Sequence, residues 1–149
     1  MKTLQVLMIG FVASMAICNC GWSAEKKIKT VEAFKAEFKK CHAKGPDAVL
    51  ALFYKHDKIP SFMVDMMKQQ LKADAVLKIK EIKVIDYVDS NPAQNAKMMK
   101  KYNMMMPTKP TNTLEITFKP QGDLLSSSGT YDIGKIDGSY YIITPISAK

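Results

Sequence analysis

Arginine is absent from the 149-residue sequence: its 22 basic residues are all lysine and, with 14 acidic residues, give a formal net charge of +8. The planar guanidinium fork that recognises phosphate and guanine is therefore missing. The lysines are also scattered along the chain instead of forming one run. The sequence predicts a solvated basic surface with salt-dependent attraction to anionic surfaces, and no specific nucleic-acid partner.

Cysteine, glycine and proline are also scarce, at three, seven and seven residues. These glycine and proline counts exclude collagen-like and low-complexity architectures. An apolar content of 47% with 24% charged residues excludes wholesale disorder. No phosphate-binding glycine loop, G-x-S-x-G elbow or H-E-x-x-H helix occurs. The composition is that of one globular domain.

The longest apolar run lies at the N-terminus, where Lys2 precedes the apolar residues 4–17. A charged start, a short apolar stretch and small residues before a polar segment predict a secretory signal peptide over residues 1–23. Cleavage is expected after Ser23 or, alternatively, after Ala24. An uncleaved anchor remains the other interpretation, because the run nearly reaches the length of a membrane span. We therefore expect an exported protein, periplasmic or secreted, with no membrane span after cleavage.

Cleavage would remove Cys18 and Cys20 and leave a single domain, residues 24–149, with Cys41 as its one cysteine. One thiol cannot form an internal disulfide, so the core must hold the domain together. Cys41 continues a helical apolar spacing made by Val31, Phe34 and Phe38. The alternative is a reactive thiol paired with His42, but adjacent residues of a helix point in different directions and cannot form a nucleophile–base pair. A buried core cysteine is therefore expected.

Helical periodicity marks the first half of the domain. Helices are predicted over residues 30–44, 46–54 and 61–71, and a short helix over residues 90–102. Thr30 is expected to cap the first helix and Ser61 the third, and Gly45 to end the first.

From residue 77 the apolar spacing changes to alternation, which predicts strands. These strands cover residues 77–84, 113–119, 127–135 and 139–145. A slip in the alternation at Lys80–Glu81 predicts a β-bulge. Asp137-Gly138 predicts a tight hairpin turn between the last two strands.

Three N-terminal helices followed by an antiparallel sheet predict an α+β fold with the helices on one face of the sheet. The order of elements, the domain length and the closing hairpin over residues 131–143 (YDIGKIDGSYYII) resemble the nuclear transport factor 2-like superfamily. The resemblance implies a cone-like domain with a pocket between the helices and a curved sheet. Cystatin-type and ferredoxin-type folds are the alternatives.

That superfamily contains both enzymes and binding modules, so the resemblance leaves the function open. We expect a non-catalytic domain that binds an unidentified small apolar or amphipathic molecule, with Tyr54, His56 and Tyr131 as its ligand-binding residues. The alternative is an enzyme of the same fold that performs proton transfer or hydrolysis with His56 and Asp57, since histidine titrates near neutral pH. No cofactor is expected, and a homodimer is left open.

Methionine is abundant, with eleven residues in the chain. Five of them are close in sequence: Met98, Met99, Met104, Met105 and Met106. Because thioethers are soft ligands that select Cu(I), a Cu(I)- or Ag(I)-binding protein is a second alternative. Apart from this set no metal site is expected, since the domain lacks a CxxC pair.

Export predicts a shortened protein. Removal of residues 1–23 would leave 126 of the 149 residues, and intact-mass measurement of the protein outside the cytoplasm should give the mass of that fragment or of one residue fewer. A full-length product held in the membrane fraction would contradict the signal-peptide prediction.

Overall fold

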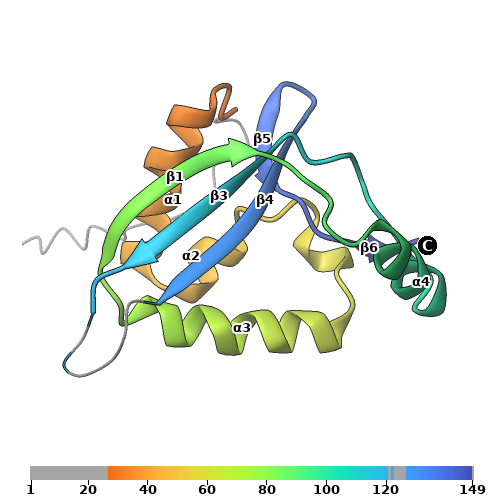
Figure 1. Cartoon of the computed structure of the whole chain (residues 1–149), viewed down its shortest axis with the longest axis horizontal. Helices are drawn as coiled ribbons and strands as arrows, with labels where there is room; N and C mark the ends of the chain where they lie inside the picture. The colour runs from red at the N-terminus through yellow and green to blue at the C-terminus, as the bar shows by residue number, and fades with distance from the viewer. Residues whose placement is uncertain (1–26, 121, 123–126, 149) are drawn as a thin grey trace, which may run out of the picture.

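The computed structural model of the protein describes residues 27–120, 122 and 127–148. The expected signal peptide and its cleavage site lie outside these residues. Within them, helices lead into a long strand, a further helix and several strands (Figure 1). The helices are α1 Val31–Lys44, α2 Pro46–Leu50, the 3-10 turn η1 His56–Lys58, α3 Ser61–Ala75 and α4 Pro92–Lys101. The strands are β1 Ile79–Asp86, β2 Met104–Met105, β3 Asn112–Phe118, β4 Ser128–Ile136, β5 Ser139–Ile142 and β6 Ile146–Ser147.

Helix α1 matches its prediction at both ends. The Thr30 hydroxyl accepts a hydrogen bond from the backbone N–H of Ala33, which satisfies a donor that the first turn leaves unpaired. The helix ends at Gly45, whose φ of +116° favours glycine. The predicted apolar stripe is confirmed, and its buried members are Phe34, Phe38 and Cys41.

Helix α2 is shorter than the sequence predicts. The apolar pattern predicts a helix as far as residue 54, but α2 ends at Leu50. Phe53 instead forms a parallel bridge with Ile142 of β5, and the backbone N–H of Tyr54 donates to the Ile142 carbonyl at 3.0 Å. The N–H group of Tyr54 thus bonds to the edge of the sheet and not to a carbonyl of the preceding helical turn, so the helix ends earlier.

Helix α3 starts differently from its prediction. Ser61 is the first residue of the helix, and Pro60 occupies the capping position. The Pro60 carbonyl accepts hydrogen bonds from the backbone N–H groups of Met63 and Val64. Ser61 as the cap is therefore wrong, because the carbonyl one residue earlier already makes the first helical hydrogen bonds.

Four strands form an antiparallel sheet in the order β1-β3-β4-β5. The pairing of β1 with β3 shifts between Ile79 and Glu81, which confirms the predicted bulge. Strands β4 and β5 meet in the predicted hairpin. Asp137 and Gly138 both have positive φ there, as a two-residue turn of type I′ requires.

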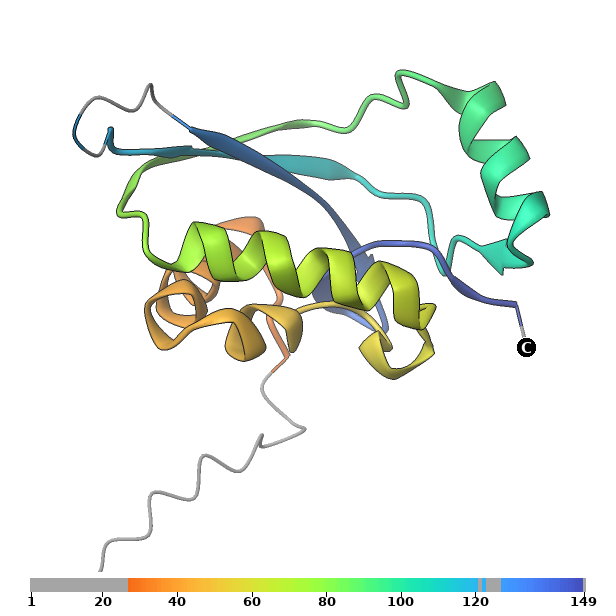
Figure 2. The same ribbon diagram turned by 90° about the horizontal axis from the view of Figure 1, so that it is seen from below.

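One face of this sheet carries the core, and we call it the inner face. Leu114, Ile116 and Phe118 of β3 are at most 1% exposed there, beside Ile82 of β1 and Ile133 of β4. Helices α1, α2 and α3 lie on this side of the sheet (Figure 2). The fold is therefore α+β, with helices packed on an antiparallel sheet, as the sequence predicts.

The remaining elements lie beyond the main sheet. The predicted helix over residues 90–102 is confirmed as α4, which packs next to β2. Strand β2 pairs with β6 in a separate two-stranded sheet. Over the described ranges, no helix has both the length and the apolar content that a membrane crossing needs.

The outer face of β4 leaves no room for a side chain at Gly134. A Cβ there would lie 3.0 Å from Cγ1 of Ile143, 3.3 Å from Cγ2 of Thr108 and 3.4 Å from the carbonyl oxygen of Lys109. We expect Gly134→Ala to lower the free energy of unfolding, measured by urea denaturation, by about 1–3 kcal/mol. Gly129→Ala on the same strand is the control, because its Cβ would meet atoms no closer than 3.9 Å. Equal losses in both variants would contradict this steric explanation.

Candidate functional site

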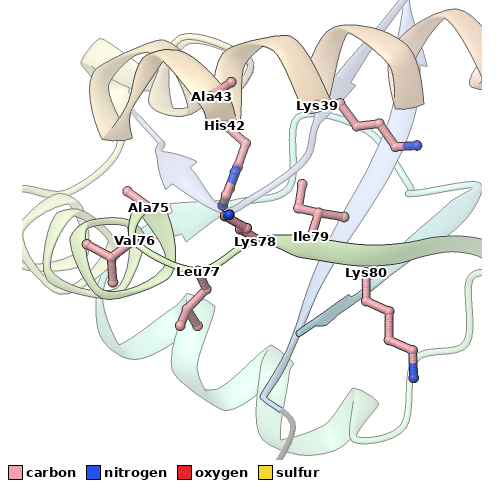
Figure 3. A pocket seen from close by; sticks show the side chains of 9 residues that line it. All are labelled: Lys39, His42, Ala43, Ala75, Val76, Leu77, Lys78, Ile79 and Lys80. Atoms are coloured by element: carbon pink, nitrogen blue, oxygen red, sulfur yellow. The ribbon is translucent and has the colours of Figure 1, made fainter. Parts of the chain in front are cut away.

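A groove of about 500 Å³ opens between the C-terminal half of α1 and the junction of α3 with β1 (Figure 3). One wall comes from α1, and the other from the end of α3 and the first residues of β1. The residues that line it are Lys39, His42, Ala43, Ala75, Val76, Leu77, Lys78, Ile79 and Lys80. The groove is open to solvent, since Lys39, Ala43, Val76, Lys78 and Lys80 are exposed along it.

His42 extends from α1 into the space between the two walls (Figure 3). Its Nε2 lies 3.1 Å from the backbone carbonyl oxygen of Asp74. Because a carbonyl oxygen can only accept, Nε2 carries the hydrogen and donates it. The imidazole ring also stacks on Phe118 of β3, with 5.7 Å between the ring centroids. His42 therefore ties the end of α1 to the end of α3 and to the sheet.

Asp74 places a carboxyl group inside the core, with only 4% of the residue exposed. Its Oδ1 accepts a hydrogen bond of 2.9 Å from Nε2 of Gln70, one turn earlier on α3. Burial raises the pKa of the Asp74 carboxyl, and the Gln70 bond and the nearby His42 oppose that shift. The charged form of Asp74 is therefore disfavoured in the folded protein.

Tyr131 lies on the inner face of β4, with its ring centroid 5.3 Å from that of Phe38 and 6.2 Å from that of Phe53. Burial, with a second contribution from the charge of Asp74, raises the pKa of Tyr131 to about 12. The phenol therefore stays protonated at neutral pH.

His42, Asp74 and Tyr131 thus form a polar cluster behind the groove, and His42 belongs to both. Ionisable groups with perturbed pKa values often mark functional sites. Here the hydrogen bonds run between parts of the protein itself, from His42 to α3 and from Gln70 to Asp74. We interpret the hydrogen bond between His42 and the Asp74 carbonyl as a polar link between α1 and α3 that fixes the spacing of the groove walls.

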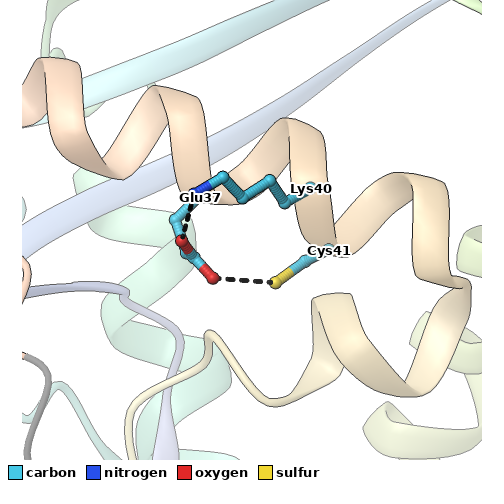
Figure 4. A network of polar contacts seen from close by, with 3 residues as sticks. All are labelled: Glu37, Lys40 and Cys41. Atoms are coloured by element: carbon cyan, nitrogen blue, oxygen red, sulfur yellow. Dashed lines mark hydrogen bonds and ion pairs between the residues drawn. The ribbon is translucent and has the colours of Figure 1, made fainter.

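Cys41 lies beside this region but shows no sign of a reactive thiol. Its Sγ–H donates to Oε1 of Glu37 at 4.0 Å, and Nζ of Lys40 lies 3.6 Å from the other oxygen of that carboxylate (Figure 4). Burial raises the pKa of the Cys41 thiol, and the negative charge of Glu37 adds to the rise. The thiol form is favoured, as expected for a core cysteine.

Three of the groove-lining residues are exposed lysines, namely Lys39, Lys78 and Lys80. The ion pairs among the described residues join Lys40 to Glu37 and Lys83 to Glu81, so they use none of these three. The apolar lining residues are Ala43, Ala75, Val76, Leu77 and Ile79. Apolar lining beside lysine ammonium groups matches a molecule with an apolar body and an anionic group.

The residues that the sequence predicts to bind the ligand lie at the edge of the sheet and on its inner face, outside the groove. His56 and Asp57 are both exposed in η1, and the ring of Tyr54 packs 5.3 Å from that of Tyr141 on β5. Tyr131 lies on the inner face of the sheet instead. None of these residues lines the groove described above.

The alternative methionine set is divided between two elements. Met98 and Met99 belong to α4, Met104 and Met105 form β2, and Met106 follows that strand. Met98 and Met105 are among the exposed large apolar side chains. As far as the described residues go, there is no group of three or more histidine, cysteine or acidic side chains that could hold a metal ion.

Sequence reasoning overlooked Asp74 and gave His42 no role of its own. Asp74 follows Leu71 by three positions and His42 follows Phe38 by four, so both continue the apolar stripe of their helix. A polar residue at a core position was the available signal. The hydrogen bond between His42 and Asp74 could not be predicted from the helical spacing of apolar residues, because the two residues lie 32 positions apart in the chain.

Comparison with known proteins finds no matching family model, no similar curated protein and no similar solved structure. The fold and the groove together define an α+β domain with a small, lysine-rimmed cleft.

The buried carboxyl predicts a pH-dependent stability difference. A raised folded-state pKa means that Asp74 favours folding at low pH, and that this contribution is lost as pH rises through the folded-state pKa. We therefore expect Asp74→Asn, which can still accept the Gln70 bond, to be more stable than the original protein at pH 7. The urea midpoints of the variant and the original protein should converge as pH falls towards about 4, the ordinary pKa of an aspartate side chain.

Asp65→Asn is the matched control, since Asp65 lies on the same helix but is exposed. A variant of Asp74 that is less stable at pH 7, or one whose advantage grows on acidification, would overturn the sign of this prediction.

Proposed function

We propose that the chain is exported, that its domain is of the nuclear transport factor 2-like type, and that it is a non-catalytic module that binds a small amphipathic molecule. The groove of about 500 Å³ between α1 and the α3–β1 junction carries this proposal. The three helices packed on the inner face of an antiparallel sheet support the resemblance in fold. The signal-like N-terminal sequence supports export.

The lining chemistry supports an amphipathic ligand with an acidic group. Leu77 and Ile79 offer apolar surface at the junction, and burial of an alkyl chain there is favourable by about 0.8 kcal/mol per CH₂. Lys39 and Lys78 bring positive charge to the same groove. A carboxylate or similar anion would therefore sit at the lysines while the apolar body lies against the apolar lining residues.

Binding is favoured over catalysis by the state of the polar groups at the groove. A histidine that acts as general base works with further polar groups that face the substrate, and none of the described residues that line the groove beside His42 is acidic. The Nε2 of His42 donates to a backbone carbonyl, and the Asp74 carboxyl is buried and bonded to Gln70. His56 and Asp57, the alternative catalytic pair, are exposed residues of η1 away from the groove lining.

Decanoate is a suitable probe, with decanol as its uncharged counterpart, and calorimetric titration measures both. We expect decanoate to bind more tightly than decanol, and Ala43→Trp to weaken decanoate binding by about tenfold or more because the indole fills the groove. Ala36→Trp is the matched control, since Ala36 is an exposed residue of the same helix outside the lining.

Replacing Lys39 and Lys78 with Gln should weaken decanoate and leave decanol unchanged. If decanoate fails to bind, or if the two tryptophan variants bind it equally, the groove is not the ligand site and the proposal fails.

A further inference from the structure

A second apolar surface is exposed at the end of α3 opposite to the groove, and we call it the α4 surface. Its side chains are between 40% and 67% exposed. They are Phe62 and Met66 of α3, Met98 of α4, Tyr102 just after α4, and Met105 of β2. Soluble domains rarely expose large apolar side chains in one group unless the surface meets a partner.

A direct contact between two aromatic rings joins the α3 part of this surface to the α4 part. Phe62 and Met66 are one helical turn apart on α3, as Met98 and Tyr102 are at the end of α4, so each pair shares a face. The rings of Phe62 and Tyr102 lie 5.3 Å apart between centroids. Figure 2 shows α4 beside the start of α3, far from α1 and α2. The exposed side chains therefore form a connected surface and not scattered positions.

The part of this surface that belongs to α4 and β2 is basic. No acidic residue occurs between Asp89 and Glu115. On α4, the helical spacing sets Lys97 and Lys101 along one flank of the face that carries Met98. The Nζ of Lys101 lies 5.1 Å from the centre of the Tyr102 ring, so its charge stands at the edge of the apolar surface. Apolar side chains bordered by lysines match a partner that is apolar inside and negatively charged outside.

We propose that the α4 surface docks onto an anionic lipid bilayer. An amphipathic helix with methionine and tyrosine on one face and lysines at its border is suited to the interface between headgroups and acyl chains. The tyrosine ring can sit at headgroup level, and the lysines can extend to the phosphates. This proposal is independent of the ligand groove, because the two sites lie at opposite ends of α3, which spans ~22 Å.

A second copy of the chain fits this surface less well. A symmetric contact would bring the lysines of α4 from both copies to the same interface, and an excess of like charge there is unfavourable. Nucleic acid fits less well too, because the centre of the surface is apolar and the chain has no arginine.

The partner is expected to be flat, because α4 is already part of the domain. Met99 is the one residue of α4 that is not exposed, and it faces the protein while the rest of the helix lies open. The contact of Phe62 with Tyr102 and the packing of α4 next to β2 hold the helix in place. A helix held in this way keeps Met99 against the domain and is not free to be enclosed on all sides by a groove of another protein.

Vesicle co-sedimentation of the full chain tests the proposal, with phosphatidylcholine vesicles and with vesicles that also contain phosphatidylglycerol. We expect tighter, salt-sensitive binding to the anionic vesicles. The double variant Lys97→Gln/Lys101→Gln should weaken that binding on the order of 30-fold, since each lysine near an anionic surface raises the affinity about fivefold. Lys72→Gln/Lys119→Gln, which neutralises two exposed lysines elsewhere, is the matched control.

Two further variants complete the test. Met66→Gln should weaken binding through the apolar contact, and Asp65→Asn should strengthen it roughly fivefold, because Asp65 is one turn from Phe62 and repels the lipid charge. Every variant carries the same N-terminal segment, so differences between them report the α4 surface. Equal binding of both vesicle types, or equal losses in the two lysine pairs, would overturn the proposal. So would self-association without lipid that Met66→Gln abolishes, because it would assign the surface to a second copy.

Discussion

Packing of α1 against the inner face of the sheet is the interaction on which the rest of the domain depends. Phe34 and Phe38 are at most 1% exposed, and the Phe38 ring lies against Tyr131 of β4. Within the part of the chain that the structure describes, Cys41 is a free, buried thiol. Apolar burial must therefore hold helices and sheet together there, at roughly 25 cal/mol per Å² of apolar surface. Because α1 is fixed in this way, one wall of the groove is fixed with it.

The second wall depends on a polar link inside that core. The Asp74 carbonyl accepts from His42 at the point where α3 ends, and the Asp74 carboxyl accepts from Gln70. Opposite it lies Gly129 of β4, where a Cβ would make an ordinary van der Waals contact of 4.0 Å with Oδ2 of Asp74. Burying a carboxyl group costs free energy, but a satisfied polar network selects one arrangement of the helices. The end of α3 and the start of β1 are placed by this network.

Both ends of α3 combine apolar side chains with nearby lysines. At the C-terminal end, a small groove combines Leu77 and Ile79 with lysines. At the N-terminal end, Phe62 and Met66 continue into the exposed, basic region of α4. Both sites pair apolar surface with ammonium groups, so both suit amphipathic anions, one as a single molecule and the other as the surface of a bilayer. A lysine-rich chain without arginine is consistent with point-charge attraction and not with bidentate recognition.

Local features were determined by the sequence itself: the Thr30 cap, the bulge near Lys80, the Asp137-Gly138 turn and the α1 stripe depend on residues within a few positions of one another. The α+β plan follows from their order. The tertiary structure alone decided where α2 ends, because the strand that takes over its backbone groups lies far along the chain. It also decided the groove, whose walls meet through His42 and the distant Asp74 carbonyl. Spacing predicts which face a residue occupies, but which distant faces meet depends on the packing of the whole chain.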